Sequence, residues 1–251
     1  MEAREYDALA AAEFEHWWFR GLHPVLVHWL RPRGVIADRR ILDAGCGTGG
    51  LAVKLESAFS RSITAFDLSR DAAAYWPRRH LTTACIASIE HAPFKAETFD
   101  AVVSVDVLES QGIEPQRAID ELARVLRPNG LLLLVVPAYR WMLNDAHHRA
   151  VRAVRRFTRQ ETLDLVRHTG LEVLRSTHFF ALPFPMIALR RLLAKWWPQD
   201  PARSDLAMPP AGLNWLLSTV MWVEGHLLRW MDLPFGTSIL ILARKSATPP
   251  S

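Results

Sequence analysis

The stretch "ILDAGCGTGG", residues 41–50, constrains the fold of this chain more than any other. A β-rich apolar run ends in the acid Asp43, and Gly45, Gly47 and Gly49 follow before the helical pattern "LAVKLESAF" begins. Glycines let the backbone turn tightly after a strand and approach a ligand, while the next helix presents free N–H groups. We therefore expect a ligand-binding strand, loop and helix within an α/β fold.

Two ligand classes fit this loop. Gly45, Gly47 and Gly50 satisfy the G-x-G-x-x-G pattern of dinucleotide-binding loops, whereas Asp43 with Gly45, Gly47 and Gly49 matches loops that hold S-adenosylmethionine. A carboxylate at the strand end would repel a pyrophosphate and help to hold the cationic S-adenosylmethionine, at least through water. Asp43 therefore favours S-adenosylmethionine, and we interpret Gly50 as a coincidental glycine.

The pattern around the loop predicts a largely parallel sheet. Short β-rich runs alternate with helical patterns from residue 40 to 140, and the unbroken apolar run "GLLLLVVP" is typical of a strand covered on both faces. One helix is expected to end near Trp76, where Pro77 stops it, and a capping box at Thr158 and Glu161 predicts the start of another.

The spacing of the last two predicted strands indicates an insertion. Roughly 57 residues separate "LEVLRSTHFF" from "TSILILARK", where a hairpin needs only a few. We expect a single domain with an N-terminal helical cap in residues 1–39, a cofactor-binding core in 40–179 and 237–245, and a helical insertion in 180–236 that serves as a lid or interaction surface.

A second acid, Asp67, closes the second predicted strand about 24 residues after Asp43, where a carboxylate can accept both hydroxyls of a ribose. Both ligand classes predict this acid, and a helix cap is its alternative role. Downstream, "APFKAETFDAVVSVDVLE" contains motifs that a dinucleotide enzyme does not need. With "DAGCGTG", these motifs resemble the class I S-adenosylmethionine-dependent methyltransferases over residues 41–137.

The resemblance implies a Rossmann-like, seven-stranded, mostly parallel sheet with helices on both faces and S-adenosylmethionine as the cofactor. The positions that it assigns to the cofactor are Asp43, Gly45, Cys46, Gly47, Gly49, Asp67, Leu68, Ser88, Ile89 and Asp106. Ser88 and Ile89 would meet the adenine and Asp106 the methionine end. The family often has Asp at Ser88 and His at Ser110, so two expected contacts differ here.

The chain also resembles a bacterial subgroup with an N-terminal "E-x-H-W-W-F" motif, present here as Glu13 to Phe19, and with "LPFGTS" at 233–238. Members of this subgroup are associated with glycan, lipid or secondary-metabolite pathways. The resemblance thus implies a small-molecule acceptor and favours O-methylation.

His147 and His148 follow the fifth predicted strand, at the edge where ligands of open α/β sheets gather. They are our candidates for the catalytic base or an acceptor contact, because imidazole accepts protons near neutral pH; ordinary loop histidines are the alternative. Arg149, Arg152, Arg156 and Arg159 are spaced as one helical stripe, which indicates either a solvated face or a contact with an anionic acceptor.

Charge and cysteine content exclude several functions. The formal charge of +4 comes from Arg-rich segments rather than Lys tracts, so we expect no nucleic-acid partner. Cys46 and Cys85 are too few for a disulfide framework or a metal site of the usual spacing, and a cytoplasmic location fits. No secretory signal and no uncharged apolar stretch of about 18 residues is present.

Tryptophan is common, with ten residues. At helical spacing, Trp215, Trp222 and Trp230 predict core or dimer surface, whereas "MIALRRLLAKWW" combines apolar and basic residues as peripheral membrane helices do. The leading hypothesis is a methyltransferase; a nicotinamide-dependent oxidoreductase and a degenerate, methyltransferase-like binding partner remain the alternatives.

Overall fold

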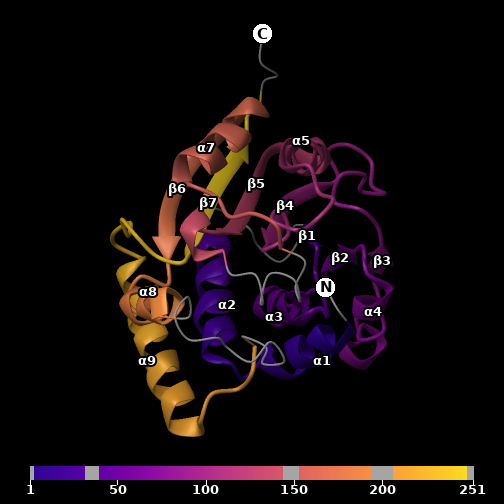
Figure 1. Cartoon of the computed structure of the whole chain (residues 1–251). Coiled ribbons are helices and arrows are strands. Elements are labelled where there is room, and N and C mark those ends of the chain that lie inside the picture. Colours follow the sequence, from indigo (N-terminus) through magenta and orange to yellow (C-terminus); the bar gives the residue numbers. More distant parts are fainter. Residues whose placement is uncertain (1–2, 32–39, 144–152, 194–205, 248–251) are drawn as a thin grey trace.

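A computed structural model describes residues 3–31, 40–143, 153–193 and 206–247 of the chain. Its centre is a seven-stranded sheet in the order β3-β2-β1-β4-β5-β7-β6 (Figure 1). The strands are β1 (Ile41–Ala44), β2 (Thr64–Asp67), β3 (Ala84–Ile86), β4 (Phe99–Val105), β5 (Leu126–Pro137), β6 (Leu171–Phe179) and β7 (Ser238–Lys245). Only the pairings of β7 with β5 and β6 are antiparallel, so the predicted fold class is confirmed.

Helices cover both faces of the sheet, as expected. They are α1 (Ala3–Ala12), α2 (Trp17–Leu30), α3 (Gly50–Phe59), α4 (Arg70–Ala73), α5 (Pro115–Val125), α7 (Arg159–His168), α8 (Phe184–Leu193) and α9 (Ala211–Leu227). One core lies between the sheet and α2 with α3, and the other between the sheet and α5 with α7. The apolar run of β5 is buried from both sides, which explains its lack of alternation.

The N-terminal segment packs against the segment before the last strand. The Trp17 N–H donates to the Asn214 side chain (2.9 Å), and the Asn214 amide donates to the Glu15 carbonyl (2.8 Å). Gly21 of α2 lies so close to α9 that an added Cβ would stand 2.7 Å from the Met221 Cβ. Figure 1 shows the resulting pair of neighbouring helices beside the sheet.

Several local expectations are corrected. Helix α4 ends at Ala73 rather than near Trp76, because the N–H groups of Tyr75 and Trp76 bond carbonyls only three residues back, and Pro77 then starts a 3-10 turn. The capping box at Thr158 and Glu161 is confirmed.

The prediction that the arginines between residues 149 and 159 form one stripe on a helix is wrong. Residues 153–158 are extended and bridge to neighbouring loops, so Arg156 and Arg159 do not share a helix face; Arg149 and Arg152 lie outside the described residues. Arg156 donates to the Ala138 carbonyl, and Arg159 donates to the side chain and carbonyl of Ser176. Both guanidinium groups therefore fix backbone at the end of the sheet.

The three described tryptophans of the insertion are not core residues. Trp215, Trp222 and Trp230 are 67%, 64% and 89% exposed. Within the described parts of the chain, no helix has both the length and the apolar character needed to cross a bilayer.

Candidate cofactor and acceptor site

The glycine loop is held in a single conformation by backbone hydrogen bonds. The N–H groups of Gly45 and Cys46 both donate to the Phe66 carbonyl at 2.9 Å, which ties the loop to β2. Gly45 and Gly49 have φ values of +82° and +91°, in the left-handed region that other residues adopt only with strain. A Cβ on Gly45 would also stand 2.3 Å from the Val107 side chain.

Asp67 lies against this loop at the end of β2, as predicted. Its carboxylate accepts from the N–H of Gly47 (2.8 Å) and from that of Ser69 (2.8 Å). Burial raises the pKa of Asp67, and these N–H donors oppose the shift. Each carboxylate oxygen can accept more than one hydrogen bond, so Asp67 retains acceptor capacity for ribose hydroxyls while it orients the loop.

Two apolar side chains beside Asp67 are exposed to solvent. Leu68 is 65% exposed, and Ile86, which pairs in register with Asp67, is 50% exposed. Exposed aliphatic groups at the carboxyl ends of adjacent strands suit the flat face of an adenine ring. Leu68 was predicted at this position, whereas Ile86 was missed, because its neighbours in the sequence give no sign that its side chain stays exposed.

Asp43 is buried and lies in an acidic environment. Burial raises the pKa of Asp43 to about 8, and the charges of Glu13 and Asp67 add to the shift. Its Oδ2 atom is buried without a hydrogen-bond partner. A buried carboxyl group with an unsatisfied oxygen is costly, and a cationic ligand at the loop would remove that cost by favouring the ionised form.

Cys46 is buried inside the loop, where its surroundings raise the pKa of the thiol, with burial as the largest cause. A thiol held in its neutral form is a poor nucleophile. Cys46 is therefore a packing residue that contributes its backbone to the loop.

The two residues expected beside the adenine, Ser88 and Ile89, differ in exposure. Ser88 forms a tight turn in which its carbonyl accepts from the His91 N–H, and it stays partly exposed. Ile89 is buried in the core between the sheet and α5, and its predicted role beside the adenine stays a prediction.

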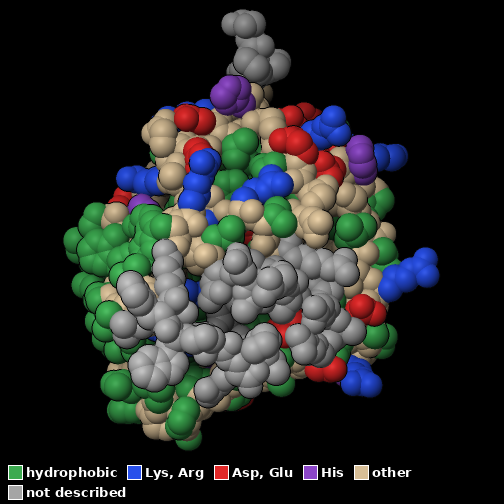
Figure 2. All heavy atoms as spheres, viewed as in Figure 1, with side chains coloured by type: hydrophobic (Ala, Val, Ile, Leu, Met, Phe, Trp, Pro, Cys, Tyr) green, Lys and Arg blue, Asp and Glu red, His purple; other side chains and the backbone are tan. Residues whose placement is uncertain are grey.

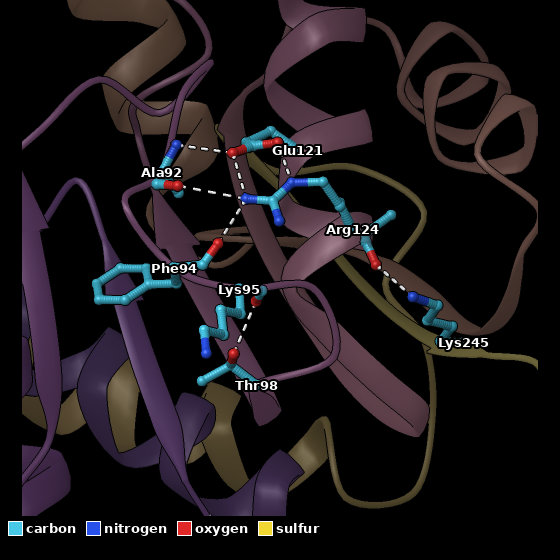
Figure 3. A network of polar contacts seen from close by, with 8 residues as sticks. Ala92, Phe94, Lys95, Thr98, Glu121, Arg124 and Lys245 are labelled. Atoms are coloured by element: carbon cyan, nitrogen blue, oxygen red, sulfur yellow. Dashed lines mark hydrogen bonds and ion pairs between the residues drawn. The ribbon is translucent and has the colours of Figure 1, made fainter.

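The turn is anchored from α5, as Figure 3 shows. Arg124 donates to the carbonyls of Ala92 (3.3 Å) and Phe94 (2.8 Å) and forms an ion pair with Glu121, whose carboxylate accepts from the Ala92 N–H (2.8 Å). The "APF" motif is thus held in place on the sheet beside Ser88.

Glu13 is a site residue whose role sequence reasoning missed. This glutamate opens the N-terminal "EFEHWWF" motif and accepts from the Gly50 N–H (3.2 Å) and from the Thr48 hydroxyl (2.5 Å). It also forms an ion pair with Arg79 at 2.6 Å. The cap segment therefore closes the N-terminus of α3, directly behind the glycine loop.

Gly50, which we interpreted from the sequence as a coincidental glycine, is required here for steric reasons. A Cβ at this position would stand 2.5 Å from the Glu13 Cδ atom. Gly50 therefore makes room for the carboxylate that caps α3.

Two acidic residues, the half-buried Asp106 and the buried Glu109, lie beyond the end of β4. Burial raises the pKa of Asp106 to about 7, and the charge of Arg156 opposes that shift. Glu109 is buried, and desolvation together with the neighbouring Asp106 charge raises its pKa. Asp106 Oδ1 and Glu109 Oε2 are buried without hydrogen-bond partners. Asp106 was predicted here; Glu109 was missed, because only the fold turns its side chain inward.

An aromatic cluster closes the same edge of the sheet beside β5. Tyr139, which follows β5, stacks on His178 of β6, with ring centroids 5.8 Å apart and planes 7° from parallel. Phe184 of α8 contacts Tyr139, Trp141 and Phe235.

Two features of this cluster are costly by themselves. Tyr139 has a φ of +62°, which is unusual for a bulky residue and is found mostly where surrounding structure enforces it. The Nδ1 atom of His178 is buried without a hydrogen bond, and burial lowers the pKa of this imidazole, which keeps it neutral. The cluster was not predicted, because its members come from four separate segments.

The predicted base candidates His147 and His148 lie outside the described residues. Among residues that are described, no group of His, Cys, Asp and Glu has the arrangement of a metal site. An open cavity of about 590 Å³ lies between the N-terminal end of α5 and one side of α7. It is lined by Arg140, Arg155 and Arg156 together with Glu161 and Asp164, and no residue of the glycine loop lines it.

Comparison with known proteins identifies the core. Residues 42–134 match the family model described as a methyltransferase domain. A protein of Mycobacterium tuberculosis described as a probable S-adenosylmethionine-dependent methyltransferase is 33% identical over 129 residues, which cover 50% of this chain and 44% of that protein. A fatty-acid O-methyltransferase of Mycolicibacterium smegmatis is 35% identical over 118 residues, covering 43% and 40%. The chain thus spans less than half the length of these relatives.

Solved structures agree in fold. A geranyl diphosphate C-methyltransferase from Streptomyces coelicolor has a TM-score of 0.59 at 16% identity, covering 89% of this chain and 81% of that one. A phosphoethanolamine N-methyltransferase from Haemonchus contortus, in complex with S-adenosylmethionine, has a TM-score of 0.58 at 17% identity, covering 90% and 53%. Residues 42–134 therefore form a methyltransferase domain with the class I fold, and S-adenosylmethionine is its cofactor.

Proposed function

We propose that this protein transfers a methyl group from S-adenosylmethionine to a hydroxyl or carboxyl oxygen of a small, largely apolar acceptor. The observation that carries the proposal is the joint placement of Asp43, Asp67 and the glycine loop at one edge of the sheet. The bound cofactor supplies a methyl group on a positively charged sulfur. The protein holds that cofactor and aligns the acceptor, because methyl transfer is an in-line displacement.

Three parts of the described site fit the cofactor. The unsatisfied Asp43 Oδ2 suits its cationic end, Asp67 has acceptor capacity for the ribose, and the exposed Leu68 and Ile86 suit the adenine. A dinucleotide would bring its pyrophosphate toward Asp43 at the end of β1, which disfavours the nicotinamide alternative.

An oxygen acceptor needs a group that takes its proton. With a pKa of about 7, Asp106 is poised to accept a proton near neutral pH, and Glu109 lies beside it. We propose this acidic pair as a second candidate base beside His147 and His148.

The aromatic cluster of Tyr139, His178 and Phe184 supports an apolar acceptor, because stacked rings at the sheet edge offer apolar surface with few polar atoms. Relatives named as a fatty-acid O-methyltransferase and as a ubiquinone biosynthesis O-methyltransferase support the same acceptor class and oxygen as the methylated atom.

Calorimetry with S-adenosylhomocysteine tests the cofactor role. We expect Asp67→Ala to weaken binding by at least tenfold, and the matched control Asp71→Ala, an exposed acid four residues further on, to leave it unchanged. Equal affinities of the two variants would remove Asp67 from the ribose site.

Release of S-adenosylhomocysteine, measured over fatty acids and phenols of increasing size, tests the acceptor class. Asp106→Asn should abolish the rise of kcat near pH 7 if the acidic pair is the base, whereas an unchanged pH profile would leave the histidines as candidates. Cofactor binding without turnover on any acceptor, together with stable association with a second protein, would favour the binding-partner alternative.

Location and partners remain proposals. We propose a cytoplasmic protein without a nucleic-acid partner, which fits two free cysteines and a modest positive charge.

A further inference from the structure

Helix α9 exposes an apolar surface that a helix packed on a soluble domain does not need. Its inner side buries Leu217 and Met221 against α2, yet its outer side is also apolar. The exposed residues are Trp215, Leu216, Trp222 and Val223, followed by Trp230 and Met231 just after the helix. A helix that is apolar on all sides is normally covered on all sides.

The exposed tryptophans make this surface unusual. Trp215, Trp222 and Trp230 are the three most exposed tryptophans among the described residues, and Trp230 is 89% exposed. Single exposed apolar residues are ordinary, but a contiguous apolar patch indicates an interaction site. We call the outer side of α9 with Trp230 and Met231 the tryptophan face.

Helix α8 extends the tryptophan face. Its residues Met186, Leu189 and Leu192 are exposed. The chain entering α8 is fixed to α9, because Glu224 accepts from the N–H groups of Ala181 and Leu182 at 2.9 Å each. Figure 2 shows hydrophobic side chains gathered on the side of the molecule that α8 and α9 form.

The charges around the tryptophan face distinguish two candidate occupants, a second copy of the chain and an anionic lipid surface. Between Ala211 and Leu227 the outer side of α9 carries no charged side chain, and Glu224 is buried. Arg229 follows α9 and is exposed. Of the nearby described acids, Asp232 is paired with Arg175, and Glu15 lies at the opposite end of α9.

A second copy of the chain is the less favourable occupant. A two-fold contact of the tryptophan face with itself would bring Arg229 of two molecules into one interface. An anionic lipid surface attracts Arg229, and its interfacial region accommodates tryptophan, whose ring has an apolar body and one N–H donor.

We propose that the tryptophan face docks the protein on an anionic membrane surface, with α9 lying in the plane of the interface. Phe184 of α8 continues from this surface to the aromatic cluster around Tyr139, so an acceptor in the membrane would lie near the edge of the sheet. The docking itself depends on the tryptophan face and not on the methyl-transfer reaction, and vesicle binding can be measured without turnover.

The test is co-sedimentation with vesicles of equal parts phosphatidylglycerol and phosphatidylcholine. We expect the full chain to bind, and the double variant Trp215→Ser/Trp222→Ser to partition at least tenfold less. The matched control Leu143→Ser/Val154→Ser, which also removes two exposed apolar side chains but on another part of the surface, should bind as the wild type does.

Arg229→Gln provides a variant that leaves the apolar surface in place. We expect it to weaken binding to the anionic vesicles about fivefold and to have little effect on vesicles of phosphatidylcholine alone. Quenching of tryptophan emission by brominated lipids in the wild type should be lost in the Trp215→Ser/Trp222→Ser variant. Unchanged affinity for S-adenosylhomocysteine shows that each variant is folded.

Three results would overturn the proposal. They are failure of the wild type to bind anionic vesicles, equal loss of binding in the control variant, and a concentration-dependent dimer in sedimentation equilibrium that Trp222→Ser dissolves. The last result would assign the tryptophan face to a second copy of the chain. Loss of methyl transfer with vesicle binding intact would bear only on the proposed reaction.

Discussion

Replacement of Glu13 by alanine tests whether the N-terminal cap is part of the cofactor site. The Glu13 carboxylate connects α3 to the cap by bonds to the Gly50 N–H and the Thr48 hydroxyl, and it pairs with Arg79. The side chains of Glu13 and Arg79 are 6% and 10% exposed, so the ion pair is shielded from water and salt.

The expected cost follows from what the substitution leaves behind. In Glu13→Ala, Arg79 loses its carboxylate partner in a buried position, which typically lowers the free energy of unfolding by about 3 to 5 kcal/mol. Glu13→Gln keeps a hydrogen-bond acceptor for the Gly50 N–H and removes only the charge, so we expect a smaller loss of about 1 to 2 kcal/mol. Both variants should weaken S-adenosylhomocysteine binding, because α3 begins at the glycine loop.

Urea unfolding followed by circular dichroism measures the loss, and calorimetry measures the affinity. Glu15→Ala is the matched control: it removes an exposed glutamate from the same segment, and such surface changes stay within about 0.5 kcal/mol. A Glu13→Ala variant that is no less stable than Glu15→Ala, or that loses stability without any change in cofactor affinity, would contradict a role of Glu13 in the cofactor site.

Three further predictions follow from particular contacts. Gly50→Ala should destabilise the protein by about 1 to 3 kcal/mol through its clash with Glu13, and most of this loss should disappear in a Glu13→Ala background, as a double-mutant cycle of urea unfolding would show. The Asp43 pKa of about 8 exceeds its ordinary value, so between about pH 4 and pH 8 the folded protein keeps a proton on Asp43 that the unfolded chain has lost. The free energy of unfolding should therefore fall by up to about 1.4 kcal/mol per pH unit as pH rises through this range. Asp43→Asn should remove this slope from free energies of unfolding measured against pH. Glu224→Ala leaves the N–H groups of Ala181 and Leu182 without an acceptor and should lower the free energy of unfolding by about 2 to 3 kcal/mol, whereas a thermal melt within about 1 °C of the wild type would contradict the capping role.

Elements with strong local patterns were predictable. The strand, glycine loop and helix at residues 41–59 were recognised because a β-rich run, closely spaced glycines and a helical pattern occur in that order, and the capping box at Thr158 was recognised for a similar reason. The end of α4 was not predictable, because the N–H groups of Tyr75 and Trp76 already bond carbonyls three residues back before Pro77 is reached.

The sequence by itself determined the fold class, the cofactor and the positions of Asp43 and Asp67, because each depends on residues close together in the chain. Only the tertiary structure decided what depends on distant segments. Glu13 meets Gly50 across 37 positions, and Glu109 and His178 become buried through neighbours that no local pattern predicts. The tryptophans of α9 show the same limit: their helical spacing predicted a packed face, but burial depends on whether another element covers that face, and within the described chain none does.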